Sequence, residues 1–301
     1  MKISFIGCGK VGSTTAYTAS LLGLAQEIVM VDAFQDRAHG EALDIMQCQA
    51  FLPQAKVRYG SLEASANSDI VVISAGIPRK ADEPRFMLLS RNADLIADIV
   101  RKVVLNSPNC ILFMITNPLD VMTQLAYQVS GFPAHRVIGM GTVLDTFRYR
   151  SYIAEAFGCD ARDLDAYVIG EHGETMLPLT SNIYVKGMLL ENLPCYSVEK
   201  LDEIYRAVIA ASGQVIGLKG GTVFAPAAAA CSVLEAIVRD SHRILPVCTY
   251  NSQYGVAVSL PTLVDRSGGK IVLEPLLRTD EQELFKKSLE SIKAYVAELP
   301  A

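Results

Sequence analysis

Among the four histidines of the chain, His172 stands in a setting typical of a reactive side chain. It lies between two glycines in the run Gly170-Glu171-His172-Gly173, directly after an apolar segment. We therefore expect its imidazole to sit on a tight turn. Imidazole has an ordinary pKa close to neutrality, so it can both accept and donate a proton at physiological pH. The alternative is a histidine with only a packing role.

A second run, Leu144 to Arg150 (LDTFRYR), supplies the partners that such an imidazole needs. Asp145 offers a carboxylate that can orient the ring. Arg148 offers a planar guanidinium, which suits a carboxylate on a small molecule. The three residue types together predict an enzyme that moves a proton on an acidic substrate.

The N-terminus carries a nucleotide-binding pattern, in which Gly7, Gly9 and Gly12 follow one apolar strand and open a helix. Asp32 ends the next strand, twenty residues after Gly12. In this context Gly7 permits a tight turn, Gly9 lets backbone N–H groups approach a pyrophosphate, and Gly12 allows close packing. Asp32 is expected to accept the ribose hydroxyls and to repel a 2′-phosphate, which predicts NAD rather than NADP. A glycine turn without a ligand is the alternative.

A charged loop follows the predicted strand 69–74, at the edge of a parallel sheet where open α/β sheets bind ligands. It reads AGIPRKADEPR and carries Arg79 and Arg85 before a long helix. The two arginines can close over a bound anion. The alternative is an ordinary solvated loop.

The first half alternates apolar strands with helices, which is typical of a parallel sheet buried on both faces. The expected strands are 2–7, 27–32, 56–59, 69–74, 110–116 and 136–138, and the expected helices are 11–22, 35–49 and 84–106. This pattern predicts an α/β fold with a doubly wound, Rossmann-type sheet.

The alternation of apolar strands and helices ends near residue 141. We expect a hinge there between an NAD-binding domain (1–141) and an α+β catalytic domain (142–301). The second half has predicted helices and antiparallel strands. The helices are a segment through Glu155, 198–218, 231–239 and 281–298, and the strands are 244–250, 255–261 and 270–273.

Composition excludes several classes of protein. Half of the residues are hydrophobic, so a large core can form. A net charge of −5 argues against a nucleic-acid or anionic-membrane partner. The seven cysteines include no CxxC pair, so we expect neither disulfides nor a metal site. The sequence enters its first strand without a signal peptide, and no apolar run is long enough to span a membrane, so a cytoplasmic protein is expected.

Over nearly its whole length the sequence resembles the L-lactate/L-malate dehydrogenase family, and most closely its lactate-dehydrogenase-like malate dehydrogenases. The motifs that carry the resemblance are GCGKVG with Asp32, AGIPRKADEPR, TNPLDVMT, GMGTVLDTFRYR, GEHGE and KGGTVFAPA. By this resemblance His172 is the proton donor and acceptor, and Asp145 holds it and raises its pKa. Arg148 matches the arginine that binds the substrate carboxylate next to the reacting carbon.

The resemblance implies roles for further residues. Arg85 matches the loop arginine that polarises the reacting carbonyl, and Asn117 matches an asparagine that orients the substrate and the nicotinamide region. Arg79 falls where arginine accompanies malate and glutamine accompanies lactate. The loop departs from the malate pattern RKPGMSR, and Glu83 is more lactate-like. The expected cofactor-binding residues are Gly7, Gly9, Lys10, Val11, Gly12, Asp32, Asn92 and Asn117.

The expected function is that of an NAD-dependent malate dehydrogenase, which interconverts L-malate and oxaloacetate as a homodimer or homotetramer. One alternative is a dehydrogenase of L-lactate or another 2-hydroxy-monocarboxylate. A second is a non-catalytic NAD-sensing module, which would not explain Asp145, Arg148 and His172 together. An NAD-dependent glycosidase would need metal-binding Cys and His, which the sequence does not group.

Overall fold

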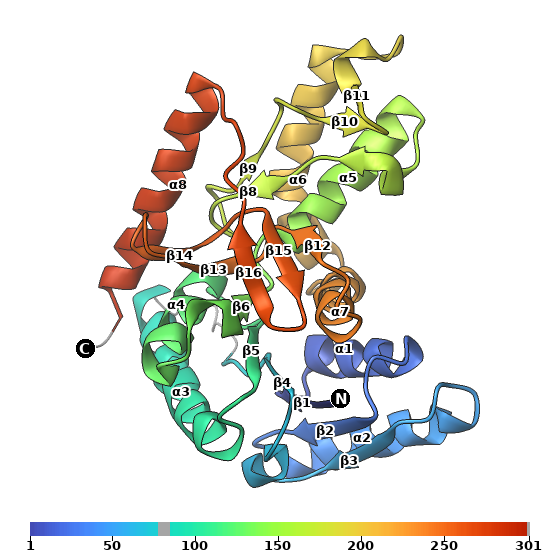
Figure 1. Ribbon diagram of the computed structural model, residues 1–301, viewed down its shortest axis with the longest axis vertical. Helices are drawn as coiled ribbons and strands as arrows, with labels where there is room; N and C mark the ends of the chain where they lie inside the picture. Colours follow the sequence, from blue (N-terminus) through green and yellow to red (C-terminus); the bar gives the residue numbers. More distant parts are fainter. Residues whose placement is uncertain (78–84, 300–301) are drawn as a thin grey trace.

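The structure, a computed structural model, describes residues 1–77 and 85–299 (Figure 1). Six parallel strands of the first half form a sheet in the order β3-β2-β1-β4-β5-β6. They are β1 (Lys2–Ile6), β2 (Glu27–Val31), β3 (Lys56–Tyr59), β4 (Ile70–Ile73), β5 (Ile111–Met114) and β6 (Val137–Gly139). The reversal of strand order beside β1 is the switch point at which such sheets bind ligands.

Helices connect these strands and cover the sheet. They are α1 (Lys10–Leu21), α2 (Gln35–Gln47), α3 (Arg85–Asn106) and α4 (Leu119–Ser130). The predicted doubly wound α/β fold is confirmed. The helix α4 was not predicted, although its first eight residues, from Leu119 to Ala126, are all buried. Its apolar residues recur at helical spacing, at Leu119, Met122, Ala126 and Val129, so the sequence did contain the signal for this helix.

The second half adds two antiparallel strands to the same sheet. β13 (Cys248–Asn251) lies beside β6, and β14 (Val256–Ser259) pairs with β13. The single strand expected over 244–250 is therefore divided, because β12 (Arg243–Leu245) belongs to another sheet. Pro246 lies between the two strands, and proline has no N–H to continue a ladder.

The remaining strands form three small sheets. β12 pairs with β15 (Thr262–Asp265), which pairs with β16 (Gly268–Val272). The second small sheet has the order β11-β10-β7, and the third joins β8 to β9. Their bounds are β7 (Leu164–Asp165), β8 (Val168–Ile169), β9 (Leu177–Pro178), β10 (Tyr184–Val185) and β11 (Met188–Leu189).

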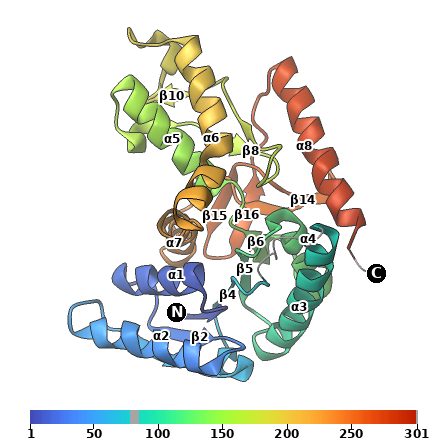
Figure 2. The same ribbon diagram turned by 180° about the vertical axis from the view of Figure 1, so that it is seen from behind.

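Four long helices belong to the second half, namely α5 (Val143–Phe157), α6 (Val198–Lys219), α7 (Phe224–Val238) and α8 (Thr279–Ala297). Short 3-10 turns are η1 (Cys48–Ala50), η2 (Leu62–Ser65), η3 (Ala134–Arg136), η4 (Ala161–Asp163) and η5 (Leu190–Asn192). Seen from behind, α7 lies directly against α1, and α8 runs along one side of the molecule past α4 (Figure 2). Helix α7 begins seven residues before the expected start at Cys231.

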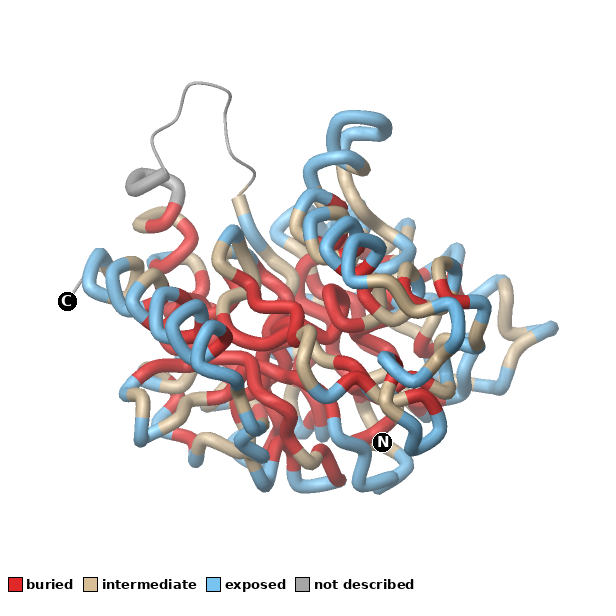
Figure 3. The backbone as a smooth tube through the Cα atoms, turned by 90° about the horizontal axis from the view of Figure 1, so that it is seen from above, coloured by how far each residue is buried: buried red, intermediate tan, exposed pale blue. Residues whose placement is uncertain are grey.

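The largest hydrophobic cluster of the described residues extends across both halves, and two smaller clusters lie within the second half. Buried alanines and valines of α7 belong to the same apolar cluster as β1, β4 and β5. Figure 3 shows this buried interior, with exposed helices around it. All seven cysteines are free thiols; four are buried and Cys195 is exposed. Among the described residues, no helix combines the length and apolarity that crossing a membrane requires.

Candidate active site

Helix α5 presents Asp145 and Arg148 from its first two turns. The two residues are three positions apart, so their side chains lie on one face of the helix. Arg148 Nη1 lies 3.1 Å from Asp145 Oδ1, and the Asp145 side chain is fully buried. An ionised carboxylate is stable in such a place only if partners compensate its charge. Arg148 is one such partner.

The turn after β8 brings His172 to the other oxygen of Asp145. Its Nδ1 lies 2.6 Å from Asp145 Oδ2. Gly170 makes this turn possible, because its φ of +87° is one that side-chain-bearing residues rarely adopt. A Cβ at this position would also meet the hydroxyl of Ser288 on α8. The residue pattern that singled out His172 thus corresponds to a backbone that requires glycine.

The electrostatics of the pair favour a charged ring beside a charged carboxylate. Burial alone would raise the pKa of Asp145, but the charge and hydrogen bond of His172, followed by those of Arg148, hold it below its ordinary value. Burial alone would lower the pKa of His172, but the charge and hydrogen bond of Asp145 raise it. The raised pKa of His172 agrees with the prediction made from the sequence. Each partner stabilises the ionised form of the other.

Arg148 has a second contact, with Ser212 on α6. Its Nη1 lies 3.3 Å from Ser212 Oγ. The Arg148 side chain is only 10 % exposed, so little of it is left in solvent. A guanidinium has five N–H donors, and these two contacts leave others free to bind a carboxylate.

The glycine-rich turn has the geometry that its sequence predicts. Gly7 has a φ of +102°, and a Cβ on it would lie 2.5 Å from the Ala75 nitrogen. A Cβ on Gly12 would meet the Gly7 carbonyl oxygen, so helix and strand are as close as they can be. A Cβ on Gly9 would meet no atom within 4 Å, so open space lies in front of the helix.

This open space lies at the N-terminus of α1, where Gly9 is the N-cap and provides no side-chain hydrogen bond. The first turn of a helix carries unpaired N–H groups and a positive dipole end, which together suit a phosphate. Asp32 lies just beyond β2, and its Oδ2 accepts a hydrogen bond from the Cys8 N–H at 2.7 Å. Its Oδ1 accepts one from the Phe34 N–H at 2.9 Å. The residues present therefore fit a dinucleotide.

The other expected cofactor residues surround this region. Lys10 is exposed and Val11 is half-buried at the start of α1. Asn92 on α3 is buried; its Oδ1 accepts from the Ile77 N–H at 2.8 Å, and its Nδ2 donates to the Asn117 carbonyl at 3.5 Å. Asn117 is exposed between β5 and α4.

The structure does not describe all the expected site residues. Arg79 and the side chain of Arg85 lie outside the described residues. The nucleotide turn and the pair of His172 and Asp145 belong to the two separate halves of the chain.

Sequence reasoning missed several residues that hold the His172 turn. Asp120 on α4 accepts a hydrogen bond from the His172 backbone N–H at 2.8 Å. Ser288 of α8 accepts one from the Glu171 N–H at 2.8 Å, and Ser291 donates to Glu171 Oε2 at 3.3 Å. The motif TNPLDVMT contains Asp120, but nothing in the sequence marks this carboxylate as a partner of the His172 turn.

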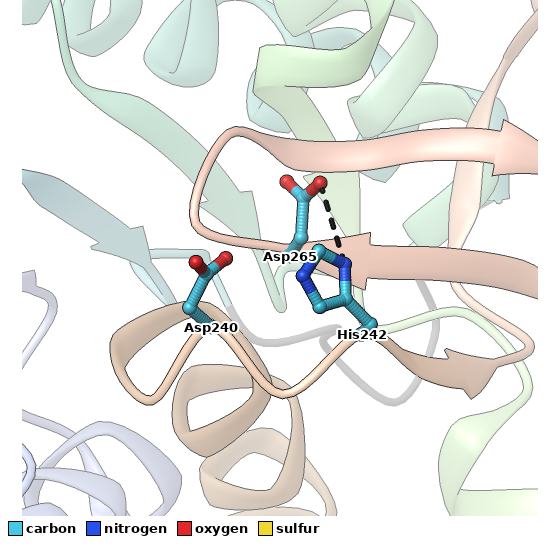
Figure 4. A group of neighbouring side chains, drawn as sticks. All are labelled: Asp240, His242 and Asp265. Carbon is cyan, nitrogen blue, oxygen red and sulfur yellow. Dashed lines mark ion pairs between the residues drawn. The ribbon is translucent and has the colours of Figure 1, made fainter.

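One group among the described residues has side chains close enough to share a metal ion, namely Asp240, His242 and Asp265 (Figure 4). Its carboxylates already have protein partners. Ser267 donates from both its N–H and its hydroxyl to Asp265 Oδ1, and Lys270 Nζ lies 3.8 Å from Oδ2. A cation would compete with that ammonium group, so the cluster carries no metal assignment.

Comparison with known proteins gives a family match for each half of the chain. The family model of the lactate/malate dehydrogenase NAD-binding domain matches residues 1–139, and the model of the lactate/malate dehydrogenase alpha/beta C-terminal domain matches residues 142–300. A curated L-lactate dehydrogenase of Clostridium perfringens is 40 % identical over 305 residues, which cover 98 % of this chain and 96 % of that protein.

Two solved structures have the same fold. A lactate dehydrogenase from a Medee basin deep-sea metagenome library has a TM-score of 0.95 and 30 % identity. The malate dehydrogenase of Cryptosporidium parvum has a TM-score of 0.93 and 35 % identity. Each alignment covers 99 % of this chain and 98 % of the other.

A Rossmann-type sheet with a dinucleotide turn, joined to a His–Asp–Arg group around a buried carboxylate, defines a class of NAD-dependent dehydrogenases that act on 2-hydroxy acids. Within that class, the chain belongs to the lactate/malate dehydrogenase family. Its cofactor is NAD.

Proposed function

We propose that the protein interconverts an L-2-hydroxy acid and the corresponding 2-keto acid, with His172 as the residue that carries the proton. The observation that supports this most strongly is the 2.6 Å contact of His172 Nδ1 with Asp145 Oδ2, with Arg148 on the other oxygen of the same carboxylate. A half-buried imidazole held in this way, beside a guanidinium that has spare donors, suits the hydroxyl and the carboxylate of one small substrate.

The roles of the residues follow from these contacts. Because Nδ1 faces Asp145, Nε2 is the ring nitrogen left to exchange a proton with the substrate. In the oxidative direction neutral His172 accepts the hydroxyl proton at Nε2, and in the reductive direction the imidazolium returns it to the carbonyl oxygen. Asp145 keeps the ring oriented and stabilises its charge. NAD, when bound, accepts or supplies the hydride.

The substrate is held by its carboxylate at Arg148 in this proposal, because a planar guanidinium binds a carboxylate through two parallel hydrogen bonds. Arg85 and Asn117 are proposed, from the family resemblance, to polarise the carbonyl and to orient the substrate. Gly7, Gly9, Lys10, Val11, Gly12, Asp32 and Asn92 are proposed as the binding residues for NAD. A division of the chain near residue 141, and a homodimer or homotetramer, remain predictions.

L-lactate, with pyruvate as its product, is the first candidate substrate. The curated relatives carry the name L-lactate dehydrogenase, and this supports the monocarboxylate better than the malate that the sequence favoured. The acidic residue Glu83 in the loop agrees with it.

L-malate is the second candidate, and one specific residue supports it. Arg79 is a cation that a monocarboxylate leaves without a partner, and an unpaired desolvated charge is costly. A solved structure named malate dehydrogenase, at 35 % identity, is also among the neighbours.

Steady-state oxidation of NADH by the purified protein, with pyruvate and with oxaloacetate in parallel, tests the proposal and separates its two candidates. If the protein is a 2-hydroxy acid dehydrogenase, it oxidises NADH rapidly with at least one of these two keto acids. If lactate is the substrate, kcat/KM is higher for pyruvate. If malate is the substrate, oxaloacetate is preferred, and Arg79→Gln moves the preference toward pyruvate. Tight NADH binding without turnover of either acid would support an NAD-sensing module instead.

A further inference from the structure

A second carboxylate lies against His172, from a helix that does not carry the first one. Asp120 stands in the first turn of α4 and is only 3 % exposed. Its Oδ2 accepts the hydrogen bond of the His172 backbone N–H at 2.8 Å, across 52 residues of sequence. Asp145 therefore contacts the ring of His172, whereas Asp120 contacts its backbone.

The other oxygen of Asp120 accepts no hydrogen bond from a nitrogen or an oxygen atom of the described residues. Oδ1 is fully buried, and so is the similarly unpaired hydroxyl of Ser259. The buried thiol of Cys248 on β13 lies beside this carboxylate and is a weak hydrogen-bond donor to it; burial raises the pKa of Cys248, and the charge of Asp120 and this hydrogen bond raise it further. A half-satisfied buried carboxylate costs stability. A neutral residue that accepts the same hydrogen bond would avoid that cost. The negative charge of Asp120 is therefore not needed for this hydrogen bond and must be explained in another way.

The two carboxylates around His172 differ in their environments. Burial raises the pKa of Asp120 to about 6, although the charge of His172 and its backbone N–H act in the opposite direction. The pKa of Asp145 is lowered instead, because His172 and Arg148 outweigh its burial. The charge of Asp120 in turn helps to raise the pKa of His172, after the larger effects of burial and of Asp145.

The charged and titratable groups around His172 and Asp120 come from four elements. Asp145 and Arg148 of α5 and Asp120 of α4 act on His172, whereas Cys248 of β13 and Glu171 of the His172 turn act on Asp120. The cation Arg148 opposes the imidazolium, and the two aspartates favour it. Asp120 is the one of these two whose side chain has no hydrogen bond to the ring itself.

We propose that Asp120 is a positioning residue for His172, which fixes the backbone of the turn through Oδ2 and whose negative charge favours the imidazolium form. The inference rests on the proposed function, in which His172 carries the proton. It adds that the chain uses two buried carboxylates for this task, one on the ring and one on the backbone. The imidazolium is needed to protonate the keto acid, so the charge of Asp120 would extend that reaction to higher pH.

The test is Asp120→Asn, which keeps a carbonyl oxygen for the His172 N–H and removes the charge, while an NH2 group replaces the other oxygen. Asp120→Ser serves as a second variant if the first does not fold. The matched control is Ser259→Ala, which removes a buried hydroxyl from the same region without changing a charge. NADH binding by fluorescence shows that each protein is folded.

Two readouts are compared in these proteins. The first is the pH titration of the His172 Hε1 proton resonance, which is assigned by its loss in His172→Asn; four histidines make the spectrum tractable. The second is the pH at which kcat/KM for reduction of the preferred keto acid falls on the alkaline side. We expect both midpoints to move to lower pH in Asp120→Asn and to stay in place in Ser259→Ala.

If Asp120 had a purely structural role, Asp120→Asn would lose kcat or fail to fold, and the midpoints of both pH titrations would stay unchanged. Midpoints of Asp120→Asn equal to those of the unaltered protein, with NADH binding intact, would overturn the proposal. The resonance titration needs no turnover, so it tests Asp120 even if the protein reduces neither keto acid. Failure of the proposed function would appear separately, as an unaltered protein without turnover or as a His172 variant that retains it.

Discussion

The imidazole Nδ1 of His172 and the Oδ2 of Asp145 are 2.6 Å apart, although 27 residues separate them in the chain. One comes from a turn after a two-residue strand, and the other from the first turn of a buried helix. This contact decides which ring nitrogen faces the protein and which remains for chemistry. The predictions below follow from it and from the nucleotide turn.

Replacing Asp145 removes the charge that holds the imidazolium. For Asp145→Asn we expect kcat for keto-acid reduction to fall by about 10²- to 10⁴-fold, because both the orientation and the basicity of the ring are disturbed. Rapid kinetics with NADH measure the loss. Asp98→Asn, an exposed carboxylate paired with Lys102, serves as the control and should retain full activity. A kcat for Asp145→Asn close to that of the control would contradict the role given to this residue.

The raised pKa of His172 predicts opposite pH profiles for the two directions. Reduction of the keto acid needs the imidazolium, so its rate falls as the pH rises through the raised pKa. Oxidation of the hydroxy acid needs the neutral ring, so its rate rises over the same interval. The charged ring also contributes stability that is complete below the unfolded pKa, near 6.5, and disappears as the pH rises through the folded pKa.

Initial rates in both directions across that interval measure the effect. Profiles that rise together, or that show no inflection above the ordinary histidine range, would rule out a proton carried by His172 in the environment described.

Arg148 is expected to bind the substrate carboxylate in a geometry that lysine cannot reproduce. Arg148→Lys should raise KM for the keto acid and lower kcat/KM by roughly 10²-fold, because a point charge replaces a planar fork. The Kd for NADH should stay the same, since the nucleotide turn lies elsewhere. Substrate titrations of the two proteins make the comparison. A lysine variant with unchanged KM would show that the carboxylate binds at another residue.

Asp32 should make the enzyme select NADH over NADPH. Its carboxylate already accepts two backbone N–H groups and would face the extra phosphate of NADPH with like charge. We expect a preference on the order of a hundredfold in kcat/KM, and a smaller one in Asp32→Ser, mainly through weaker NADH binding. Parallel assays with the two cofactors measure it. Equal values in the unaltered protein would mean that Asp32 does not meet the ribose.

Much of the fold was predictable because its signals are local. The apolar strands of the first half and the turn with Gly7 and Gly12 can be predicted from the sequence, because each is determined by residues only a few positions apart. The addition of β13 and β14 to the main sheet was not predictable in this way. It depends on the pairing of Cys248 with Gly139, and such long-range register leaves no local pattern.

The residues of the site likewise include some that the sequence predicts and some that it does not. His172, Asp145 and Arg148 were identified by residue type, by spacing and by a family resemblance, and the structure brings them together. Asp120 carries an ordinary carboxylate at an ordinary helix start, and only the three-dimensional arrangement gives it a contact with His172. The same holds for Ser288, whose place against Gly170 depends on the packing of α8.

Turnover by His172→Asn tests the central claim most directly. The variant is compared with the unaltered protein in NADH-dependent reduction of the preferred keto acid, and His242→Asn, an exposed histidine, is the control. The account predicts a loss of about 10²- to 10⁴-fold in kcat for His172→Asn, an unchanged Kd for NADH and normal activity of the control. A His172→Asn variant that retains near-normal kcat would contradict the account.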